Sequence, residues 1–270
     1  MIETQSHFDL ALAYPQWQGS GRPENLPRGA LAAAAVCSQF APLETVPLDV
    51  DESDAHGVRR WNAIFSQFRA AQKILARRQP ERVLVAGGDC AVDIAVIDYL
   101  IGRYPDLNVL WVDAHLDANT AQSSSSGNLH GMPVAAIMGH APAPMKELLG
   151  APLNPARFQY FGVQVGDEGD REFERTYRLR TLSPDDAPSG PLHIHFDLDV
   201  LDPAEFPHLA YTEGKLAIDD AVELVRRLAR EANIVGFTVT EFAPTDDGAA
   251  RDGSEVIALL CEAATGRGGS

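Results

Sequence analysis

The chain is poor in cysteine and in basic residues, and it lacks long apolar runs. Its 3 cysteines, Cys37, Cys90 and Cys261, form neither a CxxC pair nor a regular disulfide framework, so a reducing compartment is expected. No apolar run approaches the length of a membrane span, and the first ten residues have neither a basic nor an apolar signal region. We therefore expect no export signal, no membrane anchor and a cytoplasmic location.

The charge balance is strongly acidic. The 22 Lys and Arg residues are outnumbered by 38 Asp and Glu residues, which gives a net charge of −16. Nucleic-acid-binding proteins need a basic surface, so this composition argues against a nucleic-acid partner. The 270 residues contain no convincing linker or internal repeat, and we expect a single domain over residues 1–270.

Short apolar runs rich in β-formers alternate with helical stretches, which is typical of a parallel sheet covered on both faces. The predicted strands are 7–13, 82–87, 108–115, 157–163, 192–199 and 233–242. The predicted helices are 29–39, 56–78, 91–103, 133–138, 219–231 and 254–264. In the second helix apolar residues recur with helical spacing from Trp61 to Leu75, so this face should pack on the sheet.

Two clusters of acidic and imidazole side chains end two of the apolar runs. They read Asp113-Ala-His115-Leu-Asp117 and Asp197-Leu-Asp199. In an extended backbone alternate side chains share one face, so the first cluster can point into one space. Carboxylate and neutral imidazole bind Mn²⁺, Fe²⁺ or Zn²⁺, and carboxylates can bridge two ions. Either cluster alone is compatible with a polar strand end, but together they predict a two-metal hydrolase site.

Two further predicted strands also end in polar residues. Gly88, Asp89 and Cys90 follow the strand 82–87, and Glu241 lies at the end of the strand 233–242. Open parallel sheets collect their ligands at the carboxyl ends of the strands. Four strand ends therefore deliver polar side chains to what we expect to be one edge of the sheet.

Five motifs carry a family resemblance. They are AGGDC (86–90), WVDAHLDANT (111–120), SGNLHGMP (126–133), HFDLDVLDP (195–203) and TEFAP (240–244). In content and order they resemble the arginase/agmatinase (ureohydrolase) family, over most of the chain. The resemblance implies a three-layer α/β/α sandwich with a mostly parallel sheet of about eight strands. It also implies a site for two Mn²⁺ ions that hydrolyses the guanidino C–N bond of a small-molecule substrate.

The family pattern carries six metal ligands onto this sequence: Cys90, Asp113, His115, Asp117, Asp197 and Asp199. Asp113 and Asp197 would bridge both ions, whose charges acidify a shared water so that hydroxide attacks the guanidinium carbon. His115 and Asp199 would complete the shell of one ion. Asp117, which we also count among the catalytic residues, would serve the other ion together with Cys90.

The same resemblance assigns the substrate contacts. Glu241 matches the glutamate that holds the guanidinium, and His130 matches a histidine that passes protons to the leaving amine. Asn119, Ser126 and Asp167 stand where family members that act on α-amino acids contact the amino-acid head group, Asp167 by alignment of a loosely defined loop. Together they favour an arginine-like amino acid over agmatine.

Two more histidines share strand parity with these aspartates. His193 and His195 alternate with Asp197 and Asp199, but strands buried on both faces also carry residues deep below a site. The family pattern puts ligands only at the aspartates. We therefore expect both histidines in the core or behind the ligands.

Position 90 departs from the family, because most members have histidine after GGD. A buried cysteine is usually an apolar filler, but here its sulfur could reach a metal, where it would be a thiolate. The added negative charge would make the bridging water less acidic, and thiolate suits softer ions such as Zn²⁺. The site could keep Mn²⁺ and act on a more reactive guanidine, prefer another metal, or bind one ion weakly.

The substrate consequently stays open at this point. N-hydroxy-L-arginine is less basic than arginine, so it is a serious alternative, giving ornithine and hydroxyurea instead of ornithine and urea. An agmatinase, a formiminoglutamase-type enzyme and a non-catalytic ligand-binding or regulatory member are further alternatives. A deacetylase on the same fold would not need the SGNLHG and TEF elements together. Family members are often oligomers, and a homo-oligomer is compatible with this sequence.

Overall fold

The computed structural model describes residues 8–183 and 188–266. Its centre is an eight-stranded sheet with the order β2-β1-β3-β8-β7-β4-β5-β6. The strands are β1 (Leu10–Tyr14), β2 (Leu43–Thr45), β3 (Val83–Gly87), β4 (Asn108–Val112), β5 (Phe158–Phe161), β6 (Arg180–Thr181), β7 (Pro191–Asp197) and β8 (Asn233–Thr240). Each neighbouring pair of these strands is parallel, so the sheet is wholly parallel rather than mostly parallel.

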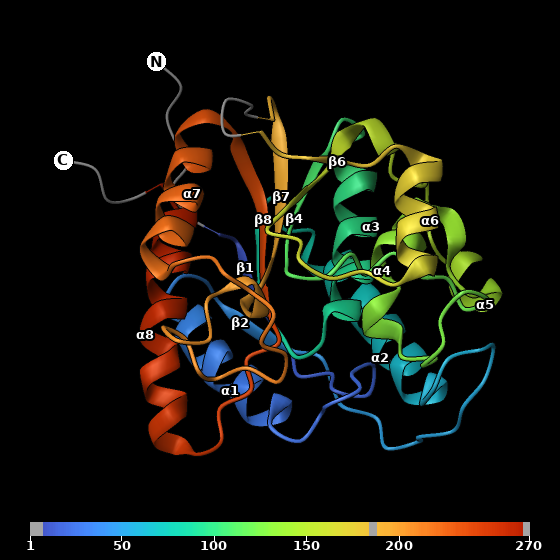
Figure 1. Ribbon diagram of the computed structural model, residues 1–270, viewed down its shortest axis with the longest axis horizontal. Coiled ribbons are helices and arrows are strands. Elements are labelled where there is room, and N and C mark those ends of the chain that lie inside the picture. The colour runs from blue at the N-terminus through green and yellow to red at the C-terminus, as the bar shows by residue number, and fades with distance from the viewer. Residues whose placement is uncertain (1–7, 184–187, 267–270) are drawn as a thin grey trace.

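Helices cover both faces of the sheet (Figure 1). One face carries α1 (Leu26–Cys37), α7 (Ile218–Glu231) and α8 (Asp247–Ala264). The other carries α2 (Trp61–Arg78), α3 (Asp93–Arg103), α4 (Pro133–Ala135), α5 (Ala143–Lys146) and α6 (Glu168–Tyr177). A separate apolar core fills the space on each side of the strands. The three-layer prediction is confirmed, including the buried apolar face of α2 between Trp61 and Leu75.

The four-residue helix α5 and three further elements were not predicted from the periodicity of the sequence. Strands β2 and β6 are three and two residues long and lie at the two edges of the sheet, where most of their side chains are exposed. Helix α6 is largely polar, and its start is set instead by a capping box between Asp167 and Asp170. Short or polar elements carry too few apolar residues to show a period.

Helix boundaries shift where backbone geometry decides them. The predicted helix 56–78 begins at Trp61, because Arg60 lies in the left-handed region with φ of 51°. The last helix begins at Asp247 instead of residue 254. Its N-terminus is stabilised by Asp246, whose side chain accepts hydrogen bonds from the backbone N–H groups of Gly248 and Ala249.

Some predictions concern residues outside the described part of the chain. These are the targeting prediction for residues 1–7, His7 of the first predicted strand, and the polar tail from residue 267. Within residues 8–183 and 188–266, no helix is long and apolar enough to cross a bilayer.

The strand order places four loops beside one another. Strands β3, β8, β7 and β4 are consecutive at the centre of the sheet, and all run in the same direction. Their carboxyl ends therefore lie at one edge, where open parallel sheets form their ligand sites.

Candidate metal centre

The four central strands bring their polar ends into one cavity. Cys90 follows β3, Asp113 follows β4, Asp197 ends β7 and Glu241 follows β8. The cavity has a volume of about 160 Å³ and is lined by Cys90, His115, Asp117, His130, Gly131, Asp170, Asp197, Asp199, Tyr211 and Glu241. A larger cavity of about 370 Å³ lies beside α3 and α5, away from these strand ends. Chemistry, and not size, marks the smaller one as the functional candidate.

The turn after β3 is built to present Cys90. A Cβ on Gly88 would lie 1.8 Å from the carbonyl oxygen of Gln16, so only glycine allows this backbone approach. The Asp89 side chain accepts hydrogen bonds from the N–H groups of Gly19 (2.8 Å) and Ala91 (3.0 Å). It thereby caps the 3₁₀ helix η1 (Cys90–Val92) and holds Cys90 in place.

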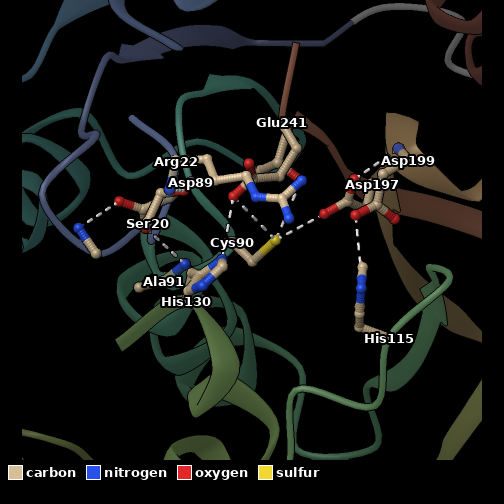
Figure 2. A network of polar contacts seen from close by, with 12 residues as sticks. Ser20, Arg22, Asp89, Cys90, Ala91, His115, His130, Asp197, Asp199 and Glu241 are labelled. Carbon is tan, nitrogen blue, oxygen red and sulfur yellow. Dashed lines mark hydrogen bonds and ion pairs between the residues drawn. The ribbon is translucent and has the colours of Figure 1, made fainter. Parts of the chain in front are cut away.

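Cys90 points directly at a carboxylate. Its side chain is buried, and Sγ donates a hydrogen bond to Asp197 Oδ2 at 2.8 Å (Figure 2). Sγ also lies 3.7 Å from Thr240 Oγ1 and 3.9 Å from Glu241 Oε1. Burial, followed by the negative charge of Asp197, raises the pKa of the Cys90 thiol well above its usual value. Only a cation beside the sulfur would make the thiolate stable here.

A second group of donors forms between β4 and β7. His115 Nδ1 lies 3.0 Å from Asp199 Oδ2 and 3.5 Å from Asp113 Oδ1. The backbone reinforces the arrangement, because Asp113 Oδ1 accepts the N–H of His115 at 2.6 Å. Asp197 Oδ1 accepts the N–H of Asp199 at 2.7 Å. Each aspartate thus orients the next donor in its own motif.

Two cavity residues have unusual backbones. Asp117 and Glu241 have φ of 50° and 58°, in the left-handed region that disfavours residues with a Cβ. Glu241 is held there because its N–H donates to the carbonyl of Gly88 at 2.8 Å. Within the described part of the chain, Asp117 Oδ2 and Glu241 Oε2 are buried without a hydrogen-bond partner. His130 Nδ1 lies 3.5 Å from the other oxygen of Glu241.

The electrostatics of the cavity are unfavourable for the protein alone. Burial and neighbouring carboxylates raise the pKa of Asp117 and of Asp197 well above the usual value. Burial, followed by the charge of Asp113, raises the pKa of Asp199 to about 7. Burial would lower the pKa of His115, but its hydrogen bonds to Asp113 and Asp199 raise it overall. Bound cations would stabilise the ionised form of these buried carboxylates.

The donor atoms fit divalent ions. Two sets have atoms that all lie within 4.8 Å of one another: Cys90, Asp113, His195 and Asp197, and Asp113, His115 and Asp199. Cations at these sets would offset the carboxylate repulsion that contributes to the raised pKa values of Asp197 and Asp199. Asp117 belongs to neither set, although its side chain lines the cavity.

The residues expected at the amino-acid head group lie farther out. Asn119 Nδ2 donates to Asp167 Oδ1 at 3.0 Å, and Asn119 Oδ1 accepts a hydrogen bond from Ser123. Ser126 is exposed. Within the described chain, none of the three expected residues lines the cavity. Their role as substrate contacts stays a prediction.

Tyr211 is a cavity residue that the sequence did not reveal. Its ring centroid lies 5.5 Å from that of His115 and 5.6 Å from that of His130, so it covers both histidines. The guanidinium of Arg22 lies 4.6 Å from the Tyr211 ring, and burial raises the pKa of Tyr211 to about 12. No local pattern marks this residue, because it lies in a long loop after η5 (Leu198–Val200). Asp170, which also lines the cavity, was missed with the rest of α6.

The family comparison agrees with this geometry. The model of the arginase family matches residues 37–266. The chain belongs to the arginase family. The resemblance read from the five motifs is therefore confirmed, together with the arginase-like fold.

Individual members of the arginase family show how far the similarity extends. Arginase from Saccharomyces cerevisiae is 30% identical over 189 residues, which are 60% of this chain and 56% of the yeast protein. This chain thus matches little more than half the length of that relative.

Solved structures extend the similarity to the whole fold. Arginase from Entamoeba histolytica, in complex with L-ornithine, aligns with a TM-score of 0.80 at 19% identity, covering 97% of this chain and 100% of that one. Formimidoylglutamase from Bacillus subtilis aligns with a TM-score of 0.71 at 16% identity, covering 95% and 86%. Because proteins with two different activities share the fold, the fold alone does not define the substrate.

Proposed function

We propose that this protein is a manganese-dependent amidinohydrolase that cleaves the guanidino C–N bond of an arginine-like amino acid. The observation that carries the proposal is the pair of donor sets that share the buried Asp113. Their other members include Cys90, His115, Asp197 and Asp199, which line one cavity together with Glu241, whose Oε2 has no hydrogen-bond partner among the described residues. Because the chain belongs to the arginase family, we assign these donors to the metal site of an amidinohydrolase. We place this activity in the cytoplasm, as the sequence predicts.

Each side chain has a defined task in such a reaction. Two Mn²⁺ ions held by the donor sets would supply an acidified water as the nucleophile at neutral pH. Glu241 would accept N–H groups of the guanidinium, because its buried Oε2 has no other partner among the described residues. His130, 3.5 Å from Glu241, would donate a proton to the departing amine.

Cys90 leads us to propose N-hydroxy-L-arginine as the preferred substrate. Its sulfur is 2.8 Å from Asp197 Oδ2, within reach of an ion that Asp197 holds. As thiolate it would bring the protein charge at the site to about −5, from about −4 for the four aspartates alone. A more negative site favours a more reactive electrophile, and an N-hydroxyguanidine is less basic than a guanidine. The products would be ornithine and hydroxyurea.

A second candidate is a ureohydrolase whose substrate lacks a free α-amino acid head group, as agmatine and formiminoglutamate do. The observation in its favour is that Asn119, Ser126 and Asp167 do not line the cavity, and that Asn119 and Asp167 bind each other. Agmatine and formiminoglutamate therefore belong in the same test.

The test is an endpoint screen of purified protein with added Mn²⁺. Arginine, N-hydroxy-L-arginine, agmatine, guanidinobutyrate and formiminoglutamate are each incubated, and urea, hydroxyurea or formamide is measured. We expect the highest turnover with N-hydroxy-L-arginine, and Cys90→His should move the ranking toward arginine. Equal or better turnover of arginine by the unaltered protein would contradict the hydroxyarginine proposal. If the protein binds two equivalents of Mn²⁺ but turns over none of the five substrates, the proposed enzymatic activity is contradicted.

A further inference from the structure

Behind the cavity, one buried carboxylate binds two histidines. Asp93, the first residue of α3, has Oδ2 at 2.7 Å from His195 Nδ1 and 2.9 Å from His193 Nε2. Its Oδ1 accepts a hydrogen bond from Thr238 Oγ1 at 2.7 Å. All three residues around Asp93 are fully buried. An ionised carboxylate can only accept hydrogen bonds, so both histidines donate to it.

This arrangement decides the tautomer of His195. With Nδ1–H donated to Asp93, a neutral His195 ring presents the lone pair of Nε2. Nε2 lies 3.4 Å from Thr240 Oγ1, which is itself 3.7 Å from Cys90 Sγ. The ring itself is held by Trp111, with 3.5 Å between the centroids and 7° between the planes. Trp111 in turn donates its indole N–H to Asp113 Oδ2 at 2.9 Å.

His195 thus offers a nitrogen to the donors already described. Four donor atoms lie within 4.8 Å of one another: a ring nitrogen of His195, the sulfur of Cys90 and one carboxylate oxygen each from Asp113 and Asp197. All four residues are buried. Donors at about 2.0–2.3 Å from one tetrahedral ion lie roughly 3.3–3.8 Å apart, so the longer separations in this set would shorten when an ion binds. One sulfur, one nitrogen and two oxygens make a four-donor set suited to tetrahedral coordination.

We propose that His195 Nε2 is a ligand of the ion that Cys90 and Asp197 hold, with Asp93 orienting its ring. The proposal rests on the metal-dependent function proposed above. A histidine ligand commonly donates its other ring nitrogen to a carboxylate, which fixes the tautomer, and the Asp93–His195 pair has that geometry. The imidazole that position 90 lacks is supplied from β7 instead. From the sequence we expected His195 to lie in the core or behind the ligands, and here it is instead proposed as a ligand itself.

His193 provides a matched control. It has the same Asp93 partner and the same complete burial, and it lies two residues earlier on β7. Among the described residues, its Nδ1 has no hydrogen-bond partner, and it faces Gly236, where an added Cβ would lie 2.2 Å away. His193 therefore shares the carboxylate network of His195 without reaching the donor atoms.

Titration with Co²⁺ tests the proposal, because its absorption spectrum reports both thiolate ligation and coordination number. The unaltered protein should show a sulfur-to-cobalt charge-transfer band that Cys90→Ser abolishes, with intense visible bands of a four-coordinate ion. His195→Gln should weaken Co²⁺ binding at this site by at least about tenfold and reduce the visible bands. His193→Gln should retain affinity and spectrum. Circular dichroism of each variant verifies folding.

Other outcomes overturn the proposal in distinguishable ways. If His195→Gln leaves the spectrum and affinity unchanged while the unaltered protein binds Co²⁺ through Cys90, His195 is not a ligand. If both histidine variants weaken binding equally, the network is structural. If the unaltered protein binds no Co²⁺ or Mn²⁺, the proposed function fails as well.

A second measurement covers a variant that does not fold. Pulsed electron paramagnetic resonance of the Mn²⁺-loaded unaltered protein, with isotopically labelled histidine, counts the imidazoles bound directly to metal. We expect coupling from two, His115 and His195. Coupling from one imidazole alone would overturn the assignment of His195.

Discussion

The two donor sets of the candidate metal centre form two ends that differ in exposure and in donor chemistry. At one end, His115 and Asp199 line the cavity with Asp113 buried beside them, and 24% of the His115 side chain is exposed. At the other end Cys90 and Asp197 line the same cavity but are almost completely buried, and His195 of the same donor set is fully buried. The open end, with His115, has the oxygen and nitrogen donors expected from the family. The enclosed end contains Cys90, where most family members have histidine. Changes at the enclosed end can therefore alter metal choice while leaving the open end intact.

Asp113→Asn should have the largest effect on metal binding and turnover, because it removes a carboxylate from both donor sets. In the part of the chain that the structure describes, Asp113 is the one residue present in both donor sets. We expect loss of both ions and a fall in turnover of roughly 10³-fold or more. Asp98→Asn is the control: the same change on α3, at a carboxylate that accepts the N–H of Gly150. Metal content measured by mass spectrometry that stays near two equivalents in Asp113→Asn would refute a shared ligand.

Single-end variants should separate the two sites. Cys90→Ser and His115→Asn are each expected to lower the affinity of one ion by about 10–100-fold and to leave the second ion bound. Timed chelation should release metal first from the His115 end, because the His115 side chain is partly exposed whereas Cys90 and Asp197 are buried. Simultaneous loss of both ions in either variant would mean that the two ends act as one unit.

Metal removal should destabilise the protein, and increasingly so at higher pH. In the metal-free protein the pKa of Asp199 is raised to about 7 from an ordinary value of 3.8. At this group the folded state then binds more protons than the unfolded state, so the contribution of Asp199 to the free energy of unfolding is most favourable below about pH 4 and is lost as the pH rises through 7. We expect chelation to lower the melting temperature by about 5–10 °C at pH 7.5, and by less at pH 5. Calorimetry showing an equal difference at both pH values would contradict this account.

The smallest effect should come from the rim of the open end. Tyr211→Leu removes the ring that contacts His115, His130 and Arg22. Each such contact is modest, so we expect KM to rise by about two- to fivefold with little change in kcat. Tyr211→Phe keeps the ring, so its KM should rise less than that of Tyr211→Leu. A large fall in kcat for Tyr211→Leu would instead assign Tyr211 to the chemistry.

Much of the centre can be read along the chain, because its donors come in short motifs. Asp113, His115 and Asp117 lie within five residues, and Asp197 and Asp199 are two apart, each motif directly after a buried strand. Apolar runs of this length are sufficient to predict the central strands and hence the edge at which they end. The family follows from five such motifs in order, without knowledge of their distances in space.

The contacts between motifs depend on strand order, which no local pattern encodes. Cys90 meets Asp197 across 107 residues, and Asp93 meets His195 across 102, because β3, β8 and β7 are neighbours in the sheet. Tyr211 reaches the cavity from a loop without periodicity, and Asp170 from a polar helix. The sequence by itself determined the donor types, the strands that carry them and the family. Only the tertiary structure decided which donors face one another, since that depends on packing between distant segments.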